Sequence, residues 1–158
     1  MVNKQFFVVA DAAYGSCSGK TVNLSWHLCR DTGGSLGENV VLIDKDNANS
    51  ACGAHTVFPD GNNLFIKTFS STSAGFEALD GTSWCSERIG ERYQRKYYRV
   101  NVQKASASAT PRFVTVIVPC SDASSVSVSA SVTGTFSQNS ESVSVTVNGQ
   151  HYNLSASW

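Results

Sequence analysis

The segment SVSVTVNGQHYNLSA, residues 142–156, decides the fold class of this chain. Before Asn148-Gly149, valines alternate with serine or threonine, and after it Tyr152, Leu154 and Ala156 alternate with polar residues. Strict alternation is typical of a strand with one packed and one solvated face. Asn-Gly is the preferred pair for a type I′ turn. The segment therefore predicts a β-hairpin.

The same period-two pattern extends outward over almost the whole chain, and helical periodicity is nearly absent. Glycine-rich or proline-containing stretches at residues 31–34, 59–62 and 80–82 are typical of turns between strands. Many short strands with frequent turns favour an antiparallel sandwich. We therefore predict a single all-β domain over residues 1–158, an antiparallel β-sandwich of about ten to twelve strands with little or no helix. The expected strands are 5–10, 21–28, 39–44, 54–58, 63–67, 76–79, 97–103, 113–118, 126–132, 141–147 and 150–156.

Composition narrows the function classes. The chain has 158 residues, 12 basic and 12 acidic side chains, and a formal net charge of zero. A neutral chain gives no indication of general binding to nucleic acid or to a membrane surface, and its apolar runs have the length of strands rather than of membrane spans. No signal-peptide pattern follows Met1, and we expect an excised domain with an added methionine.

Cysteine spacing and the search for catalytic motifs exclude several classes of site and indicate none. The five cysteines contain no C-x-x-C pair, which excludes a zinc ribbon or a thioredoxin-like motif, and we expect them to be small buried residues. The chain lacks a G-x-S-x-G elbow, a P-loop, a dinucleotide fingerprint and a recognisable carboxylate pair. No residue is therefore assigned as catalytic.

Three stretches carry a resemblance to a known family. They are the Phe-Phe-Val-Val-Ala-Asp run at residues 6–11, Trp26-His27-Leu28, and the strand and proline at residues 113–119. In this order they resemble the C-terminal β-sandwich of bacterial heparinase II/III-like polysaccharide lyases, from Phe6 to about Pro119. The resemblance implies a parent enzyme, periplasmic or secreted, that cleaves an anionic, uronic-acid-containing polysaccharide by β-elimination. It also implies that most catalytic residues lie in an upstream helical (α/α) toroid, so that this chain is a wall of the cleft.

The resemblance also implies a zinc site. In one branch of these lyases a histidine at the place of His27 and a carboxylate at the place of Asp44 bind zinc. The third ligand there is a histidine, whereas this chain has Cys85, a chemically suitable substitute; His55 is the other candidate. A catalytic histidine of that branch is replaced by Ser25, which argues against a direct catalytic role for this chain.

Residues 87–99 concentrate arginines and tyrosines. One interpretation is a solvated loop and an edge strand, where basic side chains discourage edge-to-edge pairing. The other is a surface for an anionic polymer, because arginine pairs with carboxylate or sulfate and aromatic rings stack on sugars. The residues expected to bind substrate are Arg88, Arg92, Tyr93, Arg95 and Trp84.

Two other functions stay open on the sequence. The chain can be a stand-alone carbohydrate-binding sandwich, or a purely structural domain without a ligand, because sandwich folds host many roles. Neither the polymer nor the oligomeric state follows from the sequence.

Overall fold

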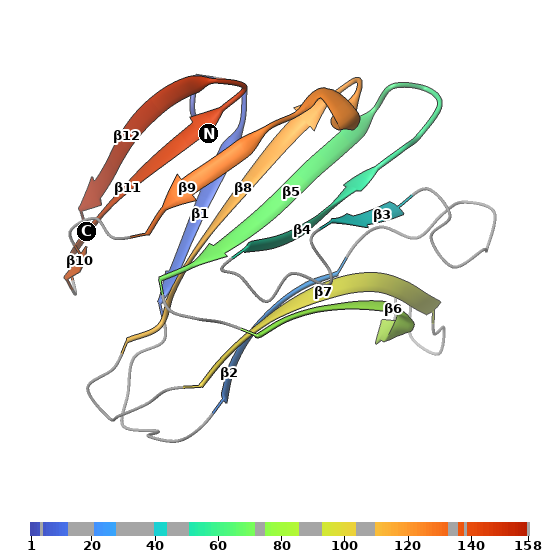
Figure 1. Ribbon diagram of the computed structural model, residues 1–158, viewed down its shortest axis with the longest axis horizontal. Helices are drawn as coiled ribbons and strands as arrows, with labels where there is room; N and C mark the ends of the chain where they lie inside the picture. Colours follow the sequence, from blue (N-terminus) through green and yellow to red (C-terminus); the bar gives the residue numbers. More distant parts are fainter. Residues whose placement is uncertain are drawn as a thin grey trace.

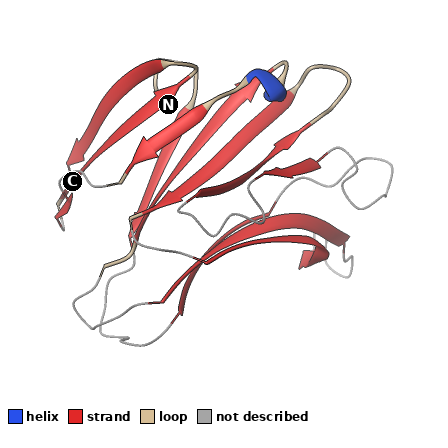
Figure 2. Cartoon of the chain, in the orientation of Figure 1, coloured by secondary structure: helices blue, strands red, loops and turns tan. Residues whose placement is uncertain are grey.

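The structure is a computed structural model, and it describes residues 1–3, 5–12, 21–27, 40–43, 51–71, 75–85, 93–103, 110–132, 136–137 and 139–157. Over these ranges it consists of strands and one short 3₁₀ helix (Figure 2). All the strand pairs are antiparallel, so the predicted antiparallel all-β fold is confirmed. The elements are β1 (Phe7–Ala12), β2 (Thr21–His27), β3 (Val40–Ile43), β4 (Ala51–Thr56), β5 (Asn63–Ser70), β6 (Gly75–Cys85), β7 (Tyr93–Gln103), β8 (Arg112–Cys120), η1 (Ala123–Ser125), β9 (Val128–Ser131), β10 (Phe136–Ser137), β11 (Ser140–Val147) and β12 (Gln150–Ser157).

The strands form three sheets (Figure 1). The largest has the order β1-β8-β5-β4-β3. A second sheet has the order β10-β11-β12, with β9 also paired to β11, and a third has the order β2-β7-β6. The five-stranded sheet is the middle layer, because both of its faces are covered.

One face of the middle sheet packs on the four-stranded sheet and forms the main core. The alternate positions of β5 and β8, such as Phe65, Phe69 and Val116, meet Val143 and Val145 of β11. Val116 and Val145 are 0% and 1% exposed. The polar positions of β11 lie between these valines and face away from the core, as the sequence alternation predicts. Burial of this apolar stripe is the main driving force that holds the two sheets together.

The opposite face of the middle sheet is also buried at several of its positions. Thr68 and Thr115 are both 0% exposed, and their hydroxyls share a hydrogen bond of 2.8 Å. Ile66 and Phe113 lie on the same face and are buried. Trp26 of β2 lines the same cavity as Ile66 on this side of the sheet. The third sheet is therefore an additional layer beyond the two-sheet packing that the sequence predicts.

An ion pair closes one end of the main core. Nη2 and Nε of Arg112 lie 2.9 Å and 3.3 Å from Oε1 of Glu141, and both residues are buried. Arg112 begins β8, whereas Glu141 lies near the start of β11. The pair therefore links the two sheets through a charged contact, where the valines of the core end.

Two predicted turns are confirmed. Asn148 and Gly149 have φ of 50° and 79°, as a type I′ turn requires, and they join β11 to β12. The turn after Pro59 contains Gly61 with φ of 76°. Asn63 fixes this second turn, because its Oδ1 accepts bonds from the Phe58 N–H and from Thr56, while Nδ2 donates to the carbonyls of Phe58 and Ser121.

Other expectations were wrong in detail. Residues 80–82 do not end a strand, because β6 continues to Cys85. They lie inside β6, where its pairing with β7 shifts register between Leu79 and Ser83. β7 is the middle strand of its sheet and not an edge strand. The two-residue strand β10 was not predicted. Among the residues described, the chain has no helix long and apolar enough to cross a membrane.

Candidate functional site

Two of the predicted zinc ligands lie on the third sheet, and Asp44 lies outside the described residues. His27 pairs with Tyr97 on β7, and Cys85 pairs with Tyr93 from the other side of β7. Four residues along a strand and two strand spacings across a sheet separate their backbones by roughly 16 Å. A tetrahedral zinc needs each ligand atom within about 2.3 Å. His27 and Cys85 therefore do not fit a single ion on this register.

His55, the other candidate, also lies elsewhere. It is on β4 opposite Phe65, on the face of the middle sheet that packs on the four-stranded sheet, and its Nδ1 lies 3.2 Å from the carbonyl of Thr56. No group of three metal-ligating side chains occurs in the described parts of the chain. Zinc binding by His27 and Asp44 stays a prediction.

The described residues among those predicted to bind substrate lie on opposite faces of the third sheet. Arg88 and Arg92 lie outside the described residues. Tyr93 and Arg95 are alternate positions of β7 and share one face, whereas Trp84 pairs with Gln94 and belongs to the other.

The face that carries Tyr93 and Arg95 continues along β7 with Tyr97 and Arg99. Across from these two positions lie His27 and Ser25 of β2. The register thus gathers the predicted histidine and part of the predicted basic surface on one side of a three-stranded sheet. The two features lie far apart along the chain and only the sheet register brings them together.

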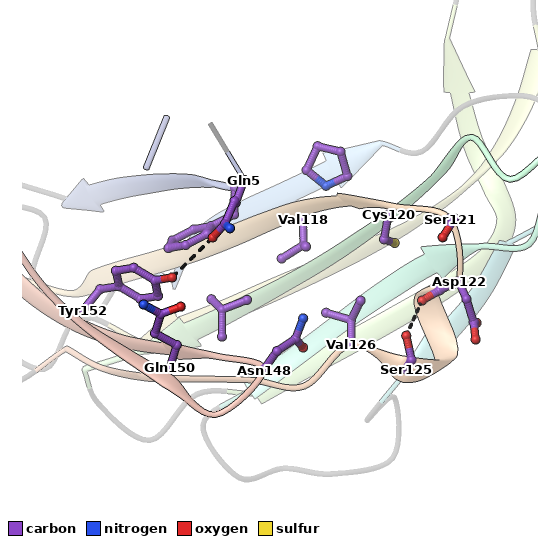
Figure 3. Close-up of a pocket in the computed structure, with 13 residues that line it drawn as sticks. Gln5, Val118, Cys120, Ser121, Asp122, Ser125, Val126, Asn148, Gln150 and Tyr152 are labelled. Atoms are coloured by element: carbon purple, nitrogen blue, oxygen red, sulfur yellow. Dashed lines mark hydrogen bonds between the residues drawn. The ribbon is translucent and has the colours of Figure 1, made fainter. Parts of the chain in front are cut away.

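A cavity of about 510 Å³ opens at the end of the sandwich where β8 leads into η1 (Figure 3). Its floor is apolar and includes Phe6, Val118 and Val147. Amides and hydroxyls surround this floor, with Gln5 and Tyr152 on one side and the Asn148 turn on another. The exposed lining as a whole is more polar than apolar, and a concave surface with convergent polar groups suits a small polar ligand.

Several polar groups of this cavity are held in place. The Tyr152 hydroxyl donates to Oε1 of Gln5 at 3.3 Å, and the Tyr152 ring packs edge-on against Phe6 with centroids 4.9 Å apart. Oδ1 of Asn148 accepts a bond of 2.9 Å from the Ser127 N–H. The amide nitrogens of Gln5 and Asn148 are therefore the groups that can donate to a ligand.

The cavity is weakly negative. Hydrogen bonds from the Ser124 side chain and N–H, at 2.6 Å and 2.9 Å, hold the pKa of Asp122 below its ordinary value. Burial, with a smaller contribution from Asp122, raises the pKa of the Cys120 thiol, so the thiol stays neutral at pH 7. None of the described residues that line the cavity is Lys, Arg or His. An anionic ligand meets an ionised carboxylate here, and the basic group that acts on this carboxylate is His55, which lies outside the lining.

A second cavity, of about 680 Å³, lies on the other side of β8, beneath β2. It is lined by Trp26, Phe58 and Ile117 among others and is mainly apolar. The indole N–H of Trp26 is buried with no hydrogen-bond partner in the described structure. A buried unpaired donor costs free energy.

Comparison with known proteins identifies the relatives of this chain. No family model matches it. A heparin-sulfate lyase of Bacteroides thetaiotaomicron is 36% identical over 158 residues, which is 98% of this chain. A crystal structure of heparinase III superposes with a TM-score of 0.82 at 34% identity over 99% of the chain. The chain is homologous to one part of the heparinase III lyases.

Only a small part of each relative is matched. The chain spans 20% of the Bacteroides thetaiotaomicron lyase and 21% of a 28% identical heparin-sulfate lyase of Bacteroides stercoris. It covers 22% of the heparinase III structure. The heparan sulfate lyase of Pedobacter heparinus, 22% identical with a TM-score of 0.72, shares the fold. The predicted resemblance to the heparinase II/III-like lyases is confirmed.

Sequence reasoning did not find the residues of the cavity in Figure 3. They come from residues 5–6, 118–126 and 147–152, three segments that are far apart along the chain. Only the Asn-Gly turn gave a local signal, and it predicted a hairpin. Amide side chains such as Gln5 and Gln150 have no spacing that marks them in advance.

Proposed function

We propose that this chain is a single β-sandwich domain of a larger polysaccharide lyase. The parent enzyme cleaves an anionic, uronic-acid-containing polysaccharide by β-elimination. The observation that carries the proposal is the 36% identity to a heparin-sulfate lyase over almost the whole chain. The sandwich supports the cleft, and the main catalytic residues lie in an upstream helical toroid. A parent of this kind is periplasmic or secreted.

The face of the third sheet that carries Tyr93, Arg95, Tyr97 and Arg99 is the wall of the cleft in this proposal. Arg95 and Arg99 are four positions apart along β7, which separates their backbones by about 13 Å, so an extended polymer that runs along the strand can meet both positions. Guanidinium groups bind carboxylate and sulfate in a two-pronged geometry, and tyrosine rings stack on sugar faces. The wall contributes binding, while a base and an acid from elsewhere carry out the elimination.

The proposal also includes a zinc site at His27 and Asp44. His27 and Asp44 are suitable ligands by type, and when bound the metal would stabilise the third sheet. Elemental analysis of chelator-free protein tests this directly, with His27→Ala as the matched variant. Near-stoichiometric zinc that disappears in the variant supports the site, and zinc below about one tenth of an equivalent in the wild-type protein rejects it.

Activity measurements test the role of the domain. The isolated chain should give no unsaturated product, followed by its ultraviolet absorbance, with heparan sulfate, heparin, hyaluronan or alginate. Elimination needs a base, an acid and a carboxylate neutraliser together, and loss of such a unit removes most of the rate. Turnover that is lost in His27→Ala would show that the catalytic residues lie in this chain instead.

Binding measurements test the wall. The isolated chain should bind heparan sulfate weakly, and the affinity should fall with salt, because exposed charges are screened. Arg95→Ala and Arg99→Ala should each weaken binding, while Lys67→Ala on the middle sheet should not. Equal binding by all three variants would place the polymer elsewhere.

The full open reading frame tests the architecture of the parent. A helical region upstream of this segment, preceded by a secretory signal, is the expected result. A short reading frame that encodes only this sandwich would instead support a stand-alone binding protein.

A further inference from the structure

The cavity in Figure 3 lies apart from the proposed wall. It is formed where the middle sheet meets the four-stranded sheet, whereas β2, β6 and β7 contribute none of its described lining. Whatever binds in it is therefore a second ligand of this domain.

We propose that this cavity is a subsite for an uncharged sugar ring. A volume of about 510 Å³ holds a ring of this size. The C–H face of a sugar ring is apolar and suits the floor of Phe6, Val118 and Val147. Its hydroxyls are donors and acceptors at once, as side-chain amides also are.

The side chains around the rim are matched to hydroxyl groups. Gln5 and Gln150 face the cavity from two segments, and the Asn148 turn closes it (Figure 3). The Tyr152–Gln5 hydrogen bond and the Asn148–Ser127 hydrogen bond fix two of these amides before a ligand arrives. Groups that are already oriented lose less conformational freedom on binding.

Charge decides which sugars fit. Asp122 is kept ionised mainly by its hydrogen bonds with Ser124, with a smaller contribution from the nearby His55, and no described residue of the lining itself is basic. A hexuronate or a sulfated sugar therefore meets repulsion, while a neutral hexose or an N-acetylhexosamine meets only hydrogen-bonding groups. The selectivity is opposite to that of the proposed wall, so the domain distinguishes two kinds of sugar at two places.

Titration followed by ¹H–¹⁵N NMR tests the subsite without any variant. Glucose and N-acetylglucosamine are added to the ¹⁵N-labelled chain up to a concentration on the order of 100 mM, with glucuronate as the charged comparison. The expected result is saturable shifts at Cys120, Asn148 and Gln150 for a neutral sugar, and roughly fivefold weaker binding of glucuronate. No saturable shifts at these residues with either neutral sugar would overturn the proposal.

Variants then test separately the contribution of the amide side chains and the contribution of the negative charge. Gln150→Ala should weaken neutral-sugar binding by about threefold to tenfold, whereas Asn153→Ala, on the same strand but the opposite face, should leave it unchanged. Asp122→Asn keeps an acceptor for Ser124 and should bring glucuronate to within about twofold of the neutral sugar. Equal effects of Gln150→Ala and Asn153→Ala, or continued exclusion of glucuronate by Asp122→Asn, would reject the assignment. Neither outcome bears on the relationship to the lyases.

Discussion

A single conservative substitution in the ion pair between Arg112 and Glu141 should have a large effect on the stability of the domain. Glu141→Gln keeps the shape of the side chain and an acceptor at Oε1, but it removes the negative charge. Both residues are buried, at 8% and 7% exposure, so the guanidinium group would lose the negative charge of Glu141 at the end of the core. Removal of one partner of a buried pair costs about 3–5 kcal/mol. We expect about 3 kcal/mol, because glutamine still accepts a hydrogen bond.

Such a loss is large relative to the whole stability of the domain. Domains unfold with about 5–15 kcal/mol, and at this size 1 kcal/mol corresponds to about 2–4 °C. The Glu141→Gln protein should therefore melt roughly 6–12 °C lower. Urea unfolding followed by tryptophan fluorescence gives the free energy, and a thermal scan gives the melting temperature.

The matched controls are a double variant and an exposed acid. Arg112→Met with Glu141→Leu replaces the pair by apolar side chains and should recover most of the lost stability. Asp60→Asn, in an exposed turn, should leave stability nearly unchanged. A loss below about 1 kcal/mol in Glu141→Gln would refute the reasoning that this pair closes the core.

Three further changes test other parts of the packing. Gly53→Ala should destabilise by about 2–3 kcal/mol in urea unfolding, because its Cβ would lie 2.2 Å from the carbonyl oxygen of Ile66 on the neighbouring strand. Asn63→Ala should cost about 2–4 kcal/mol by the same measurement, since it leaves buried backbone groups, including those of Phe58, without a partner. Burial, and to a smaller extent Glu141, raises the pKa of Asp11, so Asp11→Asn should be more stable than wild type at pH 7. Its advantage should shrink as the pH falls through that raised pKa, because wild-type Asp11 is then protonated in the folded state.

Controls for these changes are available in the same turns and strands. Gly149→Ala meets no atom within 4 Å and should lose only about 1 kcal/mol, from its positive φ of 79°. Asn62→Ala, next to Asn63 but exposed, should be nearly neutral. A pH profile of Asp11→Asn that runs parallel to wild type between pH 3 and 7 would contradict the raised pKa.

Local patterns in the sequence were sufficient for the strands and for two turns. The alternating valines from 143 to 147 can bury one face only in a strand, and Asn148-Gly149 suits only a few turn geometries. Patterns of this kind do not say which strands become neighbours. The sequence therefore could not show that β7 lies between β2 and β6, nor that Thr68 and Thr115 face a third layer.

The candidate sites were predictable to different degrees. The relationship to the lyases followed from stretches such as Trp26-His27-Leu28, because short motifs survive in order along the chain. The register of β7 could not be predicted, and it separates His27 from Cys85. The cavity at Asn148 escaped prediction for a different reason: its polar groups are ordinary amides that become a site only when distant segments meet.

The pairing of β1 with β8 also has a consequence for how the protein is made. Phe7 lies opposite Ile117, and among the described strands β1 pairs only with β8, which the ribosome releases much later. Contacts between residues so distant along the chain form slowly. We therefore expect chaperones that act during translation to raise the yield of folded protein.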